Sequence, residues 1–310
     1  MQITIVPAST RVSAATIRFL LSSASSPTVI AYYRNLSRVP PEFLNNPNFT
    51  AKQGDIEDPS SLDFSGSDAV LSITPIWHDG RDVVEVAKEV SHNVKNKIEE
   101  TGSNVKRLVI LSSLGGQYAE GTGAIQTNHA AEQILGKTTV PEVVIVRPVY
   151  FMENWSSAVE TVKSEGFFYS TFIPSTLKIP HIAIKDIGQT LSTQLLSTGS
   201  GSPLPGPSPY PFEIHGPKHS VEDVKKVFEE ISGKEVEVRE IPPEGVEGFY
   251  SAVFPVGTVA KYYADMNNSI LEGGKLFENP EPTPDKREVG ETGLKEALEG
   301  LWNLEVGGGN

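Results

Sequence analysis

The sequence predicts an α/β protein built on a doubly wound parallel sheet, with a small and mostly helical C-terminal domain. Through the first half of the chain, short runs rich in valine and isoleucine alternate with helical patterns, which is typical of a parallel sheet with helices on both faces. The runs are continuously apolar, as in "VVIV" at residues 143–146, and strands buried on both faces have this pattern. Right-handed crossovers then make the sheet doubly wound.

The elements of the first half follow in regular order. Helical patterns are expected at residues 14–22, 81–101 and 127–135, with a polar stretch around Pro40 and a short turn from Pro59. The pattern at 81–101 is the clearest, because valines and one alanine recur on one side of a charged helix. The expected strand segments are QITIV (2–6), TVIAYYR (28–34), FTAKQGDI (49–56), DAVLSIT (68–74), VKRLVILSS (105–113) and EVVIVRP (142–148).

The pattern changes after Arg147. Residues 197–211 are rich in proline, glycine and serine and predict a linker or long surface loop. A helix should follow with Ser220 as its N-cap and Gly233 at its end. We expect a helical region at 246–271, a loop at 278–290 and a mobile tail at 305–310. The division is residues 1–155 for the sheet domain and 156–310 for a mixed segment, which returns strands to the sheet and adds a substrate-binding subdomain.

Composition limits the class of function. The chain has 310 residues, a formal net charge of −13 and no cysteine, and its sequence pI is about 5.0. The acidic balance argues against a nucleic-acid or anionic-membrane surface, and the lack of cysteine excludes disulfides and thiolate metal ligands. Without an apolar run of membrane-spanning length or a signal-peptide pattern, we expect a cytoplasmic protein that handles a small molecule. No metal site is expected.

The N-terminal stretch "ITIVPASTRVSAATIRFLL" reads as a strand, a small polar turn and an amphipathic helix. Dinucleotide-binding domains carry a glycine-rich phosphate loop at this place, yet this turn contains no glycine.

Several ordered segments resemble the NmrA-like group of atypical short-chain dehydrogenases over nearly the whole chain. The most specific is "VVIVRPVYFMENW" at 143–155; "KQGDIEDPSSL", "VKRLVILSSLGG", "KIPHIAIKDIG" and "EIHGPKHSVEDV" also match in order. The resemblance implies a Rossmann-like dinucleotide-binding domain at residues 1–155, a C-terminal substrate domain, and NADP(H) or NAD(H) as cofactor. Members include reductases, regulators and biosynthetic enzymes, so the fold alone does not give the function.

At the positions where members of that family carry the three glycines of the phosphate loop, this chain has Pro7, Thr10 and Ser13. The glycines permit the tight turn, the approach of a pyrophosphate to the backbone, and close helix–strand packing. Anion-binding groups remain, because a helix N-terminus has free N–H groups, Ser9, Thr10 and Ser13 have hydroxyls, and Arg11 has a guanidinium. We expect altered pyrophosphate binding; the alternative is a capped helix with a solvated arginine.

The resemblance also implies the remaining cofactor contacts. Arg34 ends the second strand, where relatives that prefer NADP place a cation for the 2′-phosphate, so NADP(H) is favoured; a solvated strand end is the alternative. Asp55 and Ile56 match the segment beside the adenine. The other expected cofactor contacts are Thr74, Pro75, Pro148 and Tyr150.

For proton transfer, the usual Tyr-x-x-x-Lys pair is absent, because Tyr118 is followed four residues later by Thr122. The family lysine position corresponds to Asn128, which leaves His129 as the titratable candidate. A histidine at a helix start is also often a cap or a packing residue. The expected catalytic residues are His129, Tyr118 and Ser113, and the expected pocket walls are Phe151, Asn154 and Trp155.

Three functions are compatible with these residues. The first is an NADPH-dependent reductase of a small hydrophobic carbonyl, imine or alkene in a biosynthetic pathway. The second is a non-redox isomerase, dehydratase or cyclase with weakened cofactor binding, which the lost glycines and lysine favour. The third is a dinucleotide-sensing regulator that binds a protein partner and catalyses nothing.

Overall fold

A computed structural model describes residues 1–100, 104–198, 204–278 and 287–304. Its centre is an eight-stranded sheet in the order β13-β10-β6-β5-β4-β1-β2-β3, and every neighbouring pair is parallel. The doubly wound parallel sheet is therefore confirmed. Its strands are β1 (Gln2–Val6), β2 (Thr28–Tyr33), β3 (Phe49–Gln53), β4 (Ala69–Ile73), β5 (Arg107–Leu111), β6 (Glu142–Pro148), β10 (Tyr210–His215) and β13 (Arg287–Val289).

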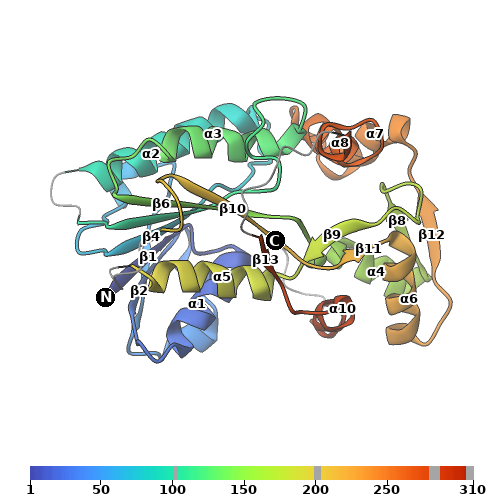
Figure 1. Cartoon of the computed structure of the whole chain (residues 1–310). Helices are drawn as coiled ribbons and strands as arrows, with labels where there is room; N and C mark the ends of the chain where they lie inside the picture. The colour runs from blue at the N-terminus through green and yellow to red at the C-terminus, as the bar shows by residue number, and fades with distance from the viewer. Residues whose placement is uncertain (101–103, 199–203, 279–286, 305–310) are drawn as a thin grey trace.

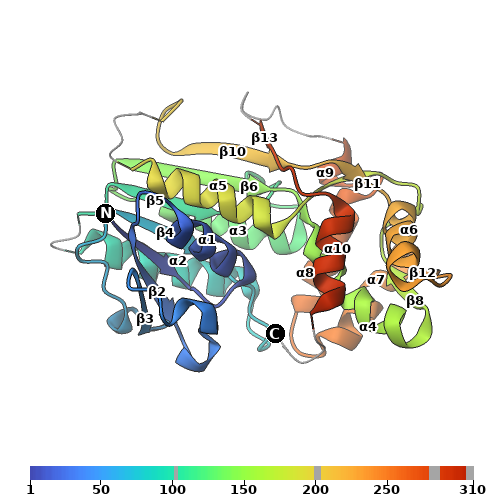
Figure 2. The same ribbon diagram turned by 90° about the horizontal axis from the view of Figure 1, so that it is seen from below.

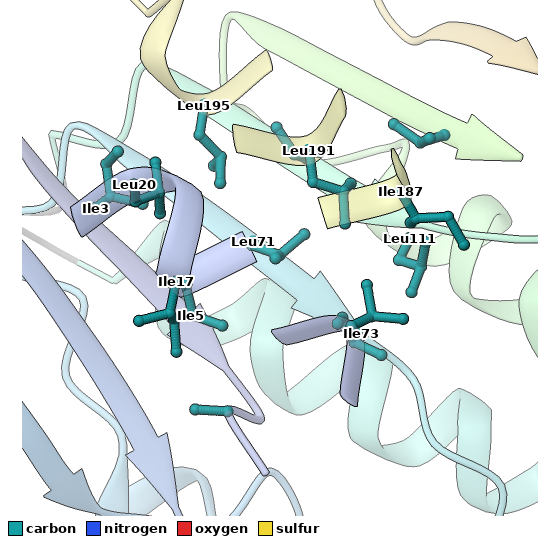
Figure 3. Close-up of a cluster of buried hydrophobic side chains, with 14 of the residues drawn as sticks. Ile3, Ile5, Ile17, Leu20, Leu71, Ile73, Leu111, Ile187, Leu191 and Leu195 are labelled. Carbon is teal, nitrogen blue, oxygen red and sulfur yellow. The ribbon is translucent and has the colours of Figure 1, made fainter. Parts of the chain in front are cut away.

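Two helices cover each face of the sheet (Figure 1). On one face, α1 (Arg11–Ser22) packs along α5 (Ile184–Leu196); on the other, α2 (Val83–Glu99) packs along α3 (Gln126–Leu135). Figure 3 shows the core under α1 and α5, where Ile17, Leu20 and Leu191 meet side chains of the strands. Burial of these apolar side chains supplies the main stabilisation of the layered sheet.

The C-terminal region packs at the carboxyl end of the sheet, and Figure 2 shows α10 between the sheet and helices α4 and α6. Its own core includes Met152, Trp155, Phe168 and Phe228. Its regular structure is mostly helical, as expected, and it also contains the short strand set β7-β9-β11 and the pair β8-β12. Its elements are β7 (Tyr150–Phe151), α4 (Ser156–Glu165), β8 (Phe167–Ser170), β9 (Ile179–Ile182), β11 (Lys218–His219), α6 (Val221–Ser232), β12 (Glu237–Glu240), α7 (Val246–Val253), α8 (Val259–Ile270), α9 (Lys275–Glu278) and α10 (Leu294–Asn303).

Some predicted boundaries were wrong. The linker expected to run to residue 211 ends earlier, because β10 starts at Tyr210; β13 lies inside the loop expected at 278–290. The helical region at 246–271 is two helices, since Pro255 lacks an N–H and Gly257 has φ 72°. Residues 101–103, 199–203, 279–286 and the expected mobile tail lie outside the described residues. No helix in the described ranges is long and apolar enough to cross a membrane.

Candidate active site

The predicted site residues gather at one edge of the sheet. Parallel strands end at the same edge, so the loops after β1, β2, β3, β4, β5 and β6 converge there. Helix α8 borders this edge, because a side chain at Gly123, in the loop after β5, would collide with its backbone at Tyr262 and Met266. The loop after β5 is therefore in direct contact with the C-terminal region at this edge.

The turn after β1 is closed by its own side chains. Thr10 is the N-cap of α1, and its hydroxyl accepts the Ser13 N–H at 3.0 Å. The Ser13 hydroxyl is buried and donates to the Pro7 carbonyl at 2.8 Å, while the two hydroxyls lie 2.8 Å apart. Thr10 and Ser13 thus stabilise the turn itself, whereas Ser9 and Arg11 are exposed.

The donor set of this turn still fits a phosphorylated dinucleotide. The N–H groups of Arg11 and Val12, the first residues of α1, belong to those that a helix leaves unpaired. The Arg11 guanidinium lies 3.4 Å from the Ser156 hydroxyl at the start of α4. Its charge also acts on Glu153, whose pKa is raised by burial and lowered in part by the Ile184 N–H and by Arg11. Unpaired N–H groups and an exposed guanidinium are suitable for a diphosphate.

Charged side chains lie at the part of the site that is predicted to hold the adenosine. Arg34 is exposed directly after β2, and Ile56 is buried. The Asp55 carboxylate accepts the N–H of Glu57 at 3.0 Å, so it also holds its own turn. Glu57 accepts the indole N–H of Trp77 at 2.8 Å.

Glu57 is an acidic residue that sequence reasoning did not find. It pairs with Arg81 at 2.6 Å, and this contact is the largest cause that lowers its pKa; the charge of Arg34 contributes least. Arg81 and Trp77 lie on the loop after β4, which also carries Thr74 and Pro75. The position of Glu57 just after "QGDI" was the one available signal, but its partners are distant in sequence.

A buried ion pair lies beneath the loop after β5. Arg147 donates to both oxygens of Glu132, at 2.9 and 2.6 Å, and the Ser112 hydroxyl donates to the same carboxylate at 2.5 Å. A Cβ on Gly116 would fall 2.5 Å from both Glu132 and Ser112, so only glycine allows the loop to lie this close. The sequence singled out neither Glu132 nor this role of Arg147.

The loop that carries Gly116 also orients His129. Its Nδ1 lies 3.0 Å from the carbonyl oxygen of Gly116. A carbonyl only accepts, so Nδ1 carries the proton and Nε2 has the lone pair in the neutral ring. Asn128 beside it is half-buried. His129 is therefore fixed in one tautomer, as a proton-transfer group requires.

The other two predicted catalytic residues lie in the same loop. Tyr118 is 6 % exposed, and the Lys275 ammonium lies 4.6 Å from its ring centroid. Ser113 is half-buried, and its hydroxyl is 3.3 Å from the Leu114 carbonyl oxygen. Tyr118 and Ser113 thus lie on the loop that His129, on α3, contacts through Gly116.

The residues predicted to form the walls of the substrate pocket differ in burial. Phe151 is half-buried and Asn154 is exposed. Trp155 is buried in the C-terminal core, where its indole N–H donates to His181 Nε2 at 3.3 Å. Tyr150 lies edge-on to Trp155, and burial raises the pKa of its hydroxyl well above the ordinary range. Trp155 therefore lies in the core behind Tyr150 and not at the surface of the site. Pro148 is buried at the end of β6.

An aromatic group lies across the loop after β4. Tyr263 stacks on Phe254 with centroids 4.9 Å apart and an interplanar angle of 13°, and on Tyr250 at 5.5 Å. His78 lies 4.5 Å from Phe254 and its Nε2 is 3.3 Å from the Tyr263 hydroxyl. Burial raises the pKa of Tyr263 to about 12 and lowers that of His78. This group is therefore uncharged at neutral pH.

Solved structures share this fold over almost the whole chain. The triphenylmethane reductase of Citrobacter sp., solved with NADP(H), is 16% identical with a TM-score of 0.72, over 97% of this chain and 100% of that one. The NADPH-dependent quinone oxidoreductase QOR2 of Escherichia coli, solved with NADPH, is 18% identical with a TM-score of 0.71, over 98% and 100%. NmrA, a negative transcriptional regulator, is 16% identical with a TM-score of 0.58, over 78% and 74%.

The sequence itself matches a family model. No curated protein matches the chain, but residues 8–176, more than half of it, match the model described as NAD(P)H-binding. This match confirms the expected nicotinamide dinucleotide cofactor, and the solved structures confirm the expected fold. The chain belongs to the NAD(P)H-binding family.

Proposed function

We propose that this protein is an NADPH-dependent reductase of an uncharged, hydrophobic, ring-containing metabolite with a carbonyl, imine or activated alkene, in a biosynthetic pathway. The observation that carries the proposal is the meeting of two kinds of group at one edge of the sheet. Cationic donors, Arg11 and Arg34, lie on one side, and the proton-transfer candidates His129 and Tyr118 lie on the other. Bound reduced nicotinamide supplies a hydride; the chain supplies position and a proton.

The residues take the following roles. The N-terminus of α1 and Arg11 hold the diphosphate, and Arg34 meets the 2′-phosphate. Asp55 and Ile56 contact the adenosine. Further contacts to the cofactor along this edge of the sheet come from Ser9, Thr10, Ser13, Thr74, Pro75, Pro148 and Tyr150.

The substrate class follows from the walls. The ring stack of Tyr250, Phe254 and Tyr263 and the half-buried Phe151 offer flat apolar faces, to which flat ring-containing compounds bind well. The proton donor lies at the loop after β5, where the Tyr118 hydroxyl, or a water held by it and by the Nε2 lone pair of His129 on α3, protonates the substrate. Two of the structural neighbours are a triphenylmethane reductase and a quinone oxidoreductase, which favours this class.

One observation favours a second candidate. The hydroxyl of Thr10 already occupies the Ser13 N–H, so this N–H is withheld from a pyrophosphate. A non-redox isomerase, dehydratase or cyclase on the same fold needs no tight dinucleotide binding. A third candidate is a dinucleotide-sensing regulator with a protein partner, because the structural neighbour NmrA is a negative transcriptional regulator.

Cofactor titration tests the proposal. NADPH should bind more tightly than NADH, as measured by calorimetry or NADPH fluorescence. Arg34→Ala removes a charged hydrogen bond, which is worth about 1.5–3 kcal/mol, so NADPH binding should weaken ~10- to 100-fold while NADH binding changes less than about twofold. Arg18→Ala is the matched control, because Arg18 is an exposed arginine on α1 paired with Glu42.

Each outcome separates the candidates. Equal weakening of NADPH and NADH by Arg34→Ala would remove the 2′-phosphate assignment. No NADPH binding at millimolar concentration would remove both the reductase and the dinucleotide sensor, which leaves the non-redox enzyme. Binding without turnover of an aromatic carbonyl panel would favour the sensor.

A further inference from the structure

We propose that Glu153 competes with the cofactor diphosphate for the Arg11 guanidinium, so that binding of the dinucleotide is coupled to the uptake of a proton by Glu153. This inference rests on the proposed function, because it concerns the diphosphate that Arg11 is assigned to hold. It makes Glu153 the residue that sets how cofactor affinity depends on pH.

Glu153 lies where two helices begin side by side. Helix α1 begins at Arg11 and helix α5 at Ile184, and both pack on the same face of the sheet (Figure 1). A Cβ on Gly188 of α5 would fall 2.7 Å from the Cβ of Ala15 of α1, and each of these two residues lies four positions after the start of its helix. The first turns of α1 and α5 are therefore neighbours at the edge where the strands end.

The Glu153 carboxylate occupies the first turn of α5. Both of its oxygens accept the Ile184 N–H, at 3.0 Å each, whereas the N-cap Ala183 provides no side-chain hydrogen bond. A negative charge is stabilised at this end of a helix. The first turn of α1 contains no acidic residue. One helix start thus holds an internal anion, and its neighbour offers unpaired N–H groups to a second anion.

Arg11 connects the two helix starts electrostatically. Its guanidinium reaches the Ser156 hydroxyl, 3.4 Å away and three residues after Glu153. The pKa of Glu153 is raised above its ordinary value, because burial outweighs the Ile184 N–H and the charge of Arg11, both of which lower it; Asp186 adds to the rise. A diphosphate that takes up the guanidinium and adds negative charge therefore favours the protonated carboxyl of Glu153.

The other charged side chains of the helices packed on this segment have their own partners or are exposed. Lys185 of α5 pairs with Glu296 of α10 at 2.8 Å, and Lys295 of α10 pairs with Glu230 of α6 at 2.8 Å. The exposed ones on α4 and α10 are Glu160, Lys163, Glu165 and Glu299. The charges that act on Glu153 are therefore those of Arg11 and Asp186.

The capping contact survives the protonation of Glu153. The proton comes from solvent and binds one carboxylate oxygen, and the other oxygen still accepts the Ile184 N–H. Since both oxygens share one N–H, a single oxygen is enough to keep the start of α5 capped. Cofactor binding can therefore neutralise Glu153 without loss of this hydrogen bond.

The first test compares Glu153→Gln with the wild type. Glutamine mimics the protonated side chain, because its amide oxygen can accept the Ile184 N–H. In calorimetry with NADP⁺, which is stable in acid, Glu153→Gln should bind about five- to tenfold more tightly than the wild type near pH 8, the lower end of usual couplings between two binding events. The difference should narrow as pH falls to about 5.5, because the wild-type carboxyl is then protonated before the cofactor binds.

Two controls accompany this test. Glu160→Gln changes an exposed glutamate of α4 and should bind NADP⁺ as the wild type does at every pH. The 2′-phosphate of NADP⁺ titrates in the same way with each protein, so the ratio of the two Kd values reports Glu153. In an Arg11→Met background, Glu153→Gln should change the Kd less than about twofold, because the shared cation is gone.

A second measurement needs no variant. Binding of NAD⁺, which has no 2′-phosphate, to the wild type in buffers of different ionisation enthalpy should show net proton uptake at about pH 6. Zero uptake, or a Kd ratio that does not change with pH, overturns the coupling. An equal effect of Glu153→Gln with and without Arg11 overturns the competition. If neither NADP⁺ nor NAD⁺ binds any of these proteins at any pH, the proposed function falls, and this inference falls with it.

Discussion

Replacing Gly188 with alanine should destabilise the protein, although alanine is the better helix former. Gly188 lies inside α5, where it touches α1 across the sheet face. An added Cβ would fall 2.7 Å from the Cβ of Ala15, 2.8 Å from its carbonyl carbon and 2.9 Å from the Thr16 nitrogen. Two of these three atoms belong to the backbone, so no side-chain rotation relieves the collision.

The magnitude follows from two opposing effects. Carbon atoms pack best at about 3.5–4.0 Å, so the helices must separate by roughly 0.8 Å. Overpacking of this kind costs about 1–3 kcal/mol, and rigid backbone neighbours favour the upper end. The change from glycine to alanine returns about 1 kcal/mol of helix propensity. The net loss should be about 2 kcal/mol in the free energy of unfolding.

Gly300→Ala is the matched control. Gly300 lies inside α10, and nothing would lie within 4 Å of an added Cβ. This variant should therefore gain about 0.5–1 kcal/mol. Urea unfolding followed by tryptophan fluorescence measures both changes. A Gly188→Ala protein as stable as the wild type, alongside a stabilised Gly300→Ala protein, would refute the close approach of α1 and α5.

Three further predictions concern polar side chains. Glu132→Ala leaves the Arg147 guanidinium buried without its carboxylate and should lower the free energy of unfolding by about 3–5 kcal/mol. The control Lys185→Ala breaks an exposed ion pair and should lower it by less than ~1 kcal/mol. Equal losses of the two variants in urea unfolding would contradict the burial of the Glu132–Arg147 pair. Burial lowers the pKa of His181 to about 4, whereas an unfolded histidine titrates near 6.5. The unfolded chain therefore takes up this proton first, and stability should fall as pH drops from about 6.5 to 4, by roughly 3 kcal/mol over the full span; unchanged pH dependence in His181→Gln would reject this. Thr10→Ala removes the N-cap of α1 and should cost about 1 kcal/mol, whereas Thr10→Gly should cost a few tenths and bind NADPH more tightly than the wild type, by calorimetry.

The sequence predicted those elements that depend on contacts between residues close together in the chain. The helix after Ser220 is confirmed in detail: the hydroxyl of Ser220 accepts the Asp223 N–H, the Asp223 carboxylate accepts the Ser220 N–H, and Gly233 ends the helix at φ 67°. Strands β1, β2, β4, β5 and β6 were equally readable, because a strand buried on both faces needs an apolar run. Strand β10 was not among the expected strands, since its start lies in the predicted linker. Strand β13 was missed, since it is three residues long and its segment has no apolar run.

The candidate site was predicted in part for the same reason. Pro7, Thr10 and Ser13 marked the altered turn, because the residue types of a tight turn are set by its own backbone. Their mutual hydrogen bonds, which occupy the Ser13 N–H, depend on side-chain directions that the sequence does not contain. Glu57 was overlooked because its partner Arg81 comes from another loop.

The sequence by itself determined the alternation of strands and helices, the edge at which the loops gather, and the family to which the chain belongs. These properties follow from hydrophobic period and turn chemistry, which act over a few residues. Only the tertiary structure decided that Lys275 lies over Tyr118 and that Gly188 allows α5 to touch α1. Such contacts join segments that chain order leaves far apart, because packing places side chains by the arrangement of whole layers and not by spacing along the chain.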